Sequence, residues 1–135
     1  MNAPNADRSK SAKSGKKVIF VVDDEPMLLE LASVILEPGG YQVETFRSPE
    51  SALRAFTAAE PPPALLITDY AMHSMNGLEL IDACRRIHPR QKTLLLSGTV
   101  GPDAYHNASC QPDHFLAKPY QAKQLLDAVS AALAN

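Results

Sequence analysis

The chain has 135 residues, of which 45% are hydrophobic and 21% are charged, and its formal net charge is −2. This length suits one globular domain with one functional site, and the composition excludes a chain that is disordered throughout. The small negative charge gives no reason to expect nucleic acid or an anionic membrane as a partner, so we expect a protein partner.

The sequence also indicates where the protein works. Its apolar runs fall well short of the roughly 20 residues that span a bilayer, and the N-terminal region lacks the apolar segment of a signal peptide. We therefore expect no membrane association and a cytoplasmic location. The two cysteines, Cys84 and Cys110, form neither a metal-ligand spacing nor a disulfide framework, so both are expected to be free thiols.

Residues 1–16 are predicted to form a disordered basic tail, and residues 17–135 to form the domain. The segment from Met1 to Lys17 holds five basic residues and lacks a large apolar side chain after Met1, so nothing anchors it to a core. A basic tail can contact acidic surfaces or nucleic acid, but a solvated leader is the favoured interpretation for so dilute a run of charge.

The domain begins with a predicted strand and helix. Val18–Val22 is a continuous apolar run that ends abruptly at Asp23, as in a strand buried on both faces of a parallel sheet. Pro26 then occupies a favourable first helical position, and apolar residues recur at helical spacing until Pro38 and the two glycines after it stop the pattern.

The same alternation continues to the end of the chain. The predicted elements are a strand over Tyr41–Phe46, a helix over Pro49–Glu60, a strand over Ala64–Thr68, a helix over Leu78–His88, a strand over Thr93–Leu96, a short or irregular helix near Asp103–Ser109, a strand over His114–Ala117 and a helix over Gln121–Leu133. Five strands alternating with about five helices predict a doubly wound, flavodoxin-like α/β fold with a parallel sheet, because right-handed crossovers place helices on both faces.

Polar side chains follow the predicted strands at their carboxyl ends. Asp23 and Asp24 follow the first strand, Asp69 the third, Ser97 the fourth and Lys118 the fifth. Ligands of open α/β sheets bind at this edge, where the strand order reverses. In the strand order 2-1-3-4-5, strands one and three are neighbours, so three carboxylates are expected to share one pocket.

Carboxylates so close together repel unless a cation neutralises them, and Mg²⁺ is a hard ion that prefers oxygen ligands and retains waters and phosphate oxygens. We therefore predict a Mg²⁺ site used for phosphoryl transfer. Lys118 supplies a point charge to one phosphoryl oxygen, and Ser97 donates a hydrogen bond to another. Asp69, at the centre, is the natural carboxylate nucleophile.

Five short segments of the sequence form a recognisable series: VVDDEP at 21–26, LLITDYAM at 65–72, NGLEL at 76–80, LLLSG at 94–98 and FLAKPY at 115–120. These segments resemble the receiver domain of two-component response regulators of the chemotaxis-regulator type. Each is a weak signal by itself, but together they stand in the correct order at the correct spacing from about residue 17 to the end.

The resemblance implies a metal site and a phosphoacceptor. Asp69 is the expected phosphoacceptor and a metal ligand, Asp24 is expected to bind Mg²⁺ directly, and Asp23 is expected to act partly through water. The carbonyl of Ala71 completes the protein ligands. Lys118 matches the invariant amine of the family, and its peptide bond to the following proline resembles the cis bond common there.

The resemblance also implies a switch and partners. Ser97 would be the switch hydroxyl, and Phe115 matches the aromatic residue that rotates inward on activation, although core packing alone is an alternative role for Phe115. Phosphoryl groups would come from a sensor histidine kinase or a phosphotransfer protein, with no separate small-molecule turnover. The surface formed near 103–109, 114–117 and 121–133 would carry the output and is the family's usual pairing surface for a homodimer.

Three positions depart from the family pattern. His73 stands where the family often has proline, Gly98 replaces a small alanine, and QPDHF at 111–115 replaces a glycine-alanine approach to the last strand. The four histidines show no common zinc-ligand spacing and are interpreted as surface or loop residues.

Several alternatives stay open at this stage. The chain is either a stand-alone regulator or a receiver excised from a larger protein such as a hybrid histidine kinase. A pseudo-receiver that is never phosphorylated normally lacks an acidic, hydroxyl or lysine position, and all are present here. An aspartyl-phosphate hydrolase normally has a second acid at the position of Ala71, and a flavin phosphate would be repelled by the acidic residues 23–25.

Overall fold

The structure is a computed structural model that describes residues 15–98 and 110–134. Its strands and helices are β1 (Lys17–Val22), α2 (Pro26–Leu36), a 3₁₀ helix (Glu37–Gly39), β2 (Tyr41–Phe46), α3 (Pro49–Ala58), β3 (Leu65–Asp69), α4 (Gly77–Ile87), β4 (Thr93–Ser97), β5 (His114–Ala117) and α5 (Ala122–Ala134). The predicted helix near 103–109 and nearly all of the predicted tail lie outside the described residues.

The five strands form one parallel sheet in the order β2-β1-β3-β4-β5, which confirms the predicted topology. Each predicted strand forms within one residue of its expected bounds, because long β-branched and apolar runs suit a sheet buried on both faces. The register pairs Val22 with Thr68, so the residues that follow them, Asp23 and Asp69, lie at the same edge.

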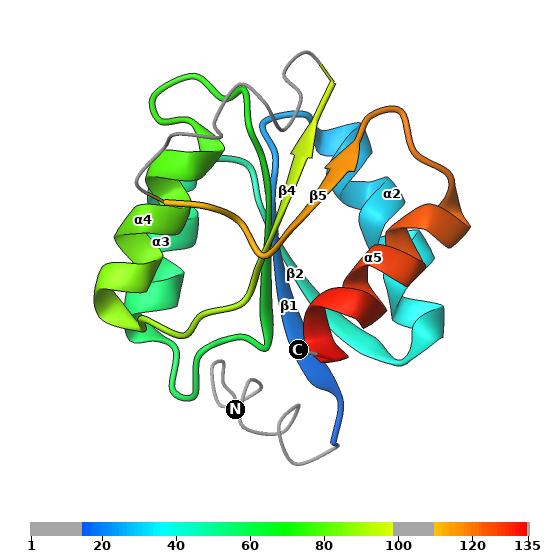
Figure 1. Cartoon of the computed structure of the whole chain (residues 1–135), viewed down its shortest axis with the longest axis horizontal. Helices are drawn as coiled ribbons and strands as arrows, with labels where there is room; N and C mark the ends of the chain where they lie inside the picture. Colours follow the sequence, from blue (N-terminus) through cyan, green and yellow to red (C-terminus); the bar gives the residue numbers. More distant parts are fainter. Residues whose placement is uncertain (1–14, 99–109, 135) are drawn as a thin grey trace.

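Helices cover both faces of the sheet (Figure 1). Alternate strand residues divide the core between these faces, because successive side chains of a strand point in opposite directions. Ile19 and Val21 pack in one cluster with residues of α2 and α5, whereas Phe20 and Val22 pack in a second cluster with residues of α3 and α4. The sheet is therefore a rigid platform between two layers of helices.

The loop after β3 passes very close to the start of α4. Gly77 Nα–H donates a hydrogen bond to the carbonyl oxygen of Tyr70 at 2.9 Å, and Asn76 caps the helix reciprocally with Glu79. A Cβ atom at Gly77 would collide with the backbone carbonyl oxygen of Asp69 and would lie 2.7 Å from Leu95 Cδ1. The absence of a side chain at Gly77 thus lets the helix approach the end of β3.

We predict that Gly77→Ala destabilises the protein by about 1–3 kcal/mol, because the collision involves backbone that cannot move without disturbing β3. Gly98→Ala is the matched control, since the nearest atom to its Cβ would be Lys118 Cβ at an ordinary 3.5 Å. Urea unfolding followed by circular dichroism measures both variants. Equal stabilities for the two variants would contradict the close approach at Gly77.

Candidate functional site

The structure brings the predicted site residues to the carboxyl edge of the sheet. Asp23 directly follows β1, Asp69 ends β3, Ser97 ends β4 and Lys118 directly follows β5. Backbone hydrogen bonds hold the two residues that lie beyond strands: Asp23 N–H donates to Phe46 O at 3.1 Å, and Lys118 N–H donates to Ser97 O at 2.9 Å. The sheet therefore fixes the backbone positions of the residues that carry these side chains.

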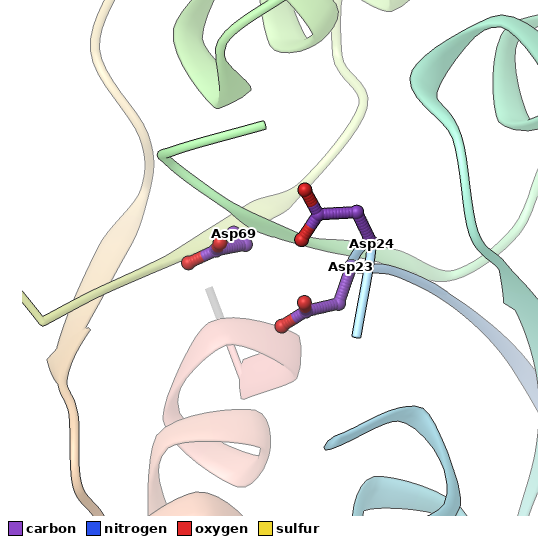
Figure 2. A group of neighbouring side chains, drawn as sticks. All are labelled: Asp23, Asp24 and Asp69. Atoms are coloured by element: carbon purple, nitrogen blue, oxygen red, sulfur yellow. The ribbon is translucent and has the colours of Figure 1, made fainter. Parts of the chain in front are cut away.

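Three carboxylates gather at this edge (Figure 2). Asp23, Asp24 and Asp69 each offer an oxygen, and these oxygens lie within 4.8 Å of one another. Asp23 and Asp69 are buried, whereas the side chain of Asp24 is 26% exposed. The three carboxylates therefore lie close together at this edge of the sheet, as expected.

Lys118 lies between two of the carboxylates. Its Nζ is 3.0 Å from Asp23 Oδ2 and 3.0 Å from Asp69 Oδ1, and its side chain is 18% exposed. Burial works against the positive charge, but the hydrogen bonds to Asp69 and Asp23 outweigh it and hold the pKa of Lys118 above its usual value. The ammonium is thus firmly charged.

The site nevertheless keeps an excess of negative charge. Burial is the main cause that raises the pKa of the Asp69 carboxyl; the ammonium of Lys118 opposes it, and the charges of Asp23 and Asp24 add to the rise. Three carboxylates face one ammonium here, so two negative charges are left over when all are ionised. Clustered carboxylate oxygens with such an excess fit the ligand preference of a hard divalent cation such as Mg²⁺.

A pocket of about 550 Å³ opens beside the carboxylates. Asp24, Asp69, Ala71, His73 and Lys118 are among its lining residues. Ala71, expected to supply a carbonyl ligand, is exposed and lies at this pocket, in the loop between β3 and α4. The pocket has room for a phosphoryl group or a hydrated ion directly next to Asp69.

His73 is a pocket residue to which sequence reasoning gave no role. Its Nε2 lies 3.3 Å from Asp24 Oδ2, and its side chain is 92% exposed. Its interpretation as a loop residue is correct, but the contact with Asp24 was missed. The signal available in the sequence was its position four residues after Asp69, where the family often has proline.

The remaining predicted residues lie around the site. Ser97 is buried, and Phe115 is partly buried against the core cluster that includes α3 and α4. The peptide bond between Lys118 and Pro119 is cis, as expected, and so is the bond before Pro61, which was not predicted.

The state of the two cysteines agrees with the sequence analysis. Cys84 and Cys110 are free thiols, as predicted, and burial raises the pKa of Cys84 to about 12. Among the described residues, the helices are all too short or too polar to cross a membrane.

Comparisons with known proteins agree with this geometry. Residues 19–130 match the family model of the response regulator receiver domain. The chain belongs to this family. Receiver domains are signalling modules of two-component systems, and this chain is therefore such a module.

Two curated relatives are longer than this receiver domain. It is 30% identical over 116 residues to the transcriptional regulatory protein KdpE of Mycobacterium tuberculosis, covering 86% of this chain and 50% of that protein. It is 32% identical to the nitrogen assimilation regulatory protein NtrX of Azorhizobium caulinodans, covering 85% of this chain and 26% of that protein. The chain thus spans half or less of the length of these relatives.

Solved structures of similar size share its fold. A receiver domain protein from Clostridium thermocellum is 28% identical with a TM-score of 0.80, over 87% of this chain and 94% of that chain. The chemotaxis protein CheY4 of Vibrio cholerae is 25% identical with a TM-score of 0.81, over 87% of this chain and 99% of that one. These similarities confirm the chemotaxis-regulator-like fold expected from the sequence.

We predict that Lys118→Met lowers the free energy of unfolding by about 1–3 kcal/mol in the absence of divalent ions, because Asp23 and Asp69 lose the cation between them. The loss should be smaller in an Asp69→Asn background, where one negative charge is already removed. A double-mutant cycle from urea unfolding in EDTA measures this coupling. The control is Lys123→Met, which breaks an exposed pair with Asp127 and should change little. Additive effects in the cycle would rule out the shared cation.

Proposed function

We propose that this receiver domain accepts a phosphoryl group on Asp69 from a sensor histidine kinase or a phosphotransfer protein, in a Mg²⁺-dependent reaction. The observation that carries the proposal is the placement of Asp69 beside two further carboxylates and an ammonium, at a pocket open to solvent. We assign the domain to residues 17–135 and the basic tail to 1–16.

The proposed transfer is an in-line displacement. An oxygen of the Asp69 carboxylate forms the new bond to phosphorus, and the donor's bond to phosphorus breaks with its electron pair leaving on the donor atom. The Lys118 ammonium, 3.0 Å from Asp69, lies where it can neutralise one phosphoryl oxygen, and Ser97 at the end of β4 would donate a hydrogen bond to another. The resulting acyl phosphate is what distinguishes the active state.

Asp24 and Asp69, with the Ala71 carbonyl, would hold Mg²⁺, and Asp23 would act partly through water. When bound, the ion supplies positive charge that stabilises the phosphoryl oxygens. The structure supports this division of labour, because Asp23 already has both oxygens engaged. Its Oδ1 accepts from Glu25 N–H at 2.9 Å, and its Oδ2 lies 3.0 Å from Lys118.

Phosphorylation would change the surface beyond β4. Ser97 would turn towards the phosphoryl group, and Phe115, which pairs with Leu95 in the sheet register, would move further into the core. The proposed output surface includes β5, α5 and the predicted helix near 103–109, which lies outside the described residues. This surface would contact the downstream protein target and would pair the two copies of a homodimer.

A donor protein must cover the surface next to Asp69, and α2, which begins two residues after Asp24, carries exposed apolar side chains. Met27, Leu31 and Val34 recur at helical spacing on α2, and their exposed fractions are 81%, 42% and 62%. Leu31 also lines a depression of about 400 Å³ together with Lys118 and Pro119. We propose that this face of α2 receives the donor, since exposed apolar side chains at such spacing favour helix-on-helix contact.

We predict that incubation with Mg²⁺ and acetyl phosphate adds the mass of one phosphoryl group to the native chain, and that Asp69→Asn prevents it. EDTA should also prevent it, because the excess negative charge would then repel the donor. Intact-mass spectrometry measures the adduct. Asp127→Asn is a matched control, since Asp127 lies on the exposed side of α5 and pairs with Lys123. An equal adduct on Asp69→Asn would refute the assignment of the phosphoacceptor, and a native chain that stays unmodified would favour a pseudo-receiver.

We predict that beryllofluoride, a mimic of the phosphoryl group, shifts the ¹⁹F resonance of fluorophenylalanine at position 115. The chain has four phenylalanines, so the resonance missing from Phe115→Leu assigns this position. Phe56, which is fully buried between α3 and the sheet, should shift far less and serves as the internal control. A resonance of Phe115 that stays in place in the bound state would assign the residue to core packing alone.

A further inference from the structure

We propose that the imidazole of His73 contributes a nitrogen ligand to the divalent ion at the carboxylate cluster, and so shifts the preference of the site from Mg²⁺ towards Co²⁺, Ni²⁺ and Zn²⁺. The inference rests on the proposed function, because it concerns the same ion. It starts from the contact between His73 Nε2 and Asp24 Oδ2 at 3.3 Å.

The distance between these two atoms suits ligands of one ion. Two ligands that each lie about 2.0–2.2 Å from a metal are roughly 3 Å apart, which is close to the observed separation. Asp24 is also the most exposed of the three carboxylates, and one of its oxygens belongs to the group that lies within 4.8 Å of Asp69 and Asp23. His73 lies outside that group, so its exposed side chain has to turn from Asp24 towards the ion in order to bind it.

The backbone holds His73 at the rim of the pocket. Its loop is anchored at both ends, because Tyr70 N–H donates to Leu96 O at 2.8 Å and Gly77 N–H donates to Tyr70 O at 2.9 Å. The side chain itself is exposed and lines the same pocket as Asp69 and Ala71. His73 can thus turn towards the ion while its loop stays attached to the sheet.

A nitrogen ligand changes the chemistry of the site. Mg²⁺ prefers oxygen ligands and keeps several of its waters, so an imidazole adds little to its binding. Co²⁺, Ni²⁺ and Zn²⁺ bind imidazole well, so for these ions the replacement of a water by His73 is favourable. The residue should therefore change the ratio of affinities more than the affinity for Mg²⁺.

The first test is isothermal titration of Co²⁺ and of Mg²⁺ into the native chain, His73→Ala and His73→Gln. We expect both variants to lower the ratio of Co²⁺ to Mg²⁺ affinity about tenfold or more, in the range found when groups around a metal are removed. His114→Gln is the control, since His114 begins β5 at the opposite edge of the sheet. An unchanged ratio in the His73 variants would overturn the inference.

The second test is pulsed electron paramagnetic resonance of bound Mn²⁺, which detects a coordinated ¹⁴N nucleus directly. We expect a histidine nitrogen coupling in the native chain that disappears in His73→Ala, and Mn²⁺ binding that is lost in Asp69→Asn. Binding that depends on Asp69 but shows no nitrogen coupling would overturn the role of His73 and leave the proposed function intact. Binding that does not depend on Asp69 would count against the metal site itself, and so against both proposals.

Discussion

The arrangement of this site depends on one electrostatic constraint, the burial of two carboxylates from neighbouring strands against one ammonium. Asp23 and Asp69 are brought together because β1 and β3 pair directly. Lys118 follows β5, which lies on the other side of β4, and its side chain reaches both carboxylates. Buried carboxylates are costly without a partner, so the lysine stabilises the fold while the third carboxylate, Asp24, leaves the site negative. The mutual repulsion of these carboxylates thereby makes the pocket beside them a good place for a cation.

The opposite end of β4 and β5 is fixed by a different network. Arg85 of α4 lies 2.9 Å from Asp113 and donates a hydrogen bond to Thr93 at 3.1 Å, while Thr93 N–H donates to Asp113 at 2.8 Å. These contacts tie the start of β4 to the residue before β5. The two strands are therefore anchored at their amino ends, opposite the edge that carries Ser97 and Lys118.

Patterns in the sequence predicted the strands and the site edge because both follow from periodic rules. Apolar runs ending in polar residues placed Asp23, Asp69 and Ser97 at strand ends, and the parallel topology then brought them together. The loop contacts could not be predicted in this way. The pairing of His73 with Asp24 and the close approach at Gly77 depend on irregular backbone, which has no period for a sequence pattern to reveal.

The two adjacent aspartates illustrate how one short motif yields two roles. Asp23 is 2% exposed and has each oxygen engaged, one with the backbone of Glu25 and one with Lys118, so releasing it to a metal would break both contacts. Asp24 points to the more open side, where its oxygen meets His73. The buried carboxylate is thus suited to holding the lysine in place, and the exposed one to meeting an incoming ion. Because both residues are aspartates, their different surroundings rather than their side-chain types give them these two roles.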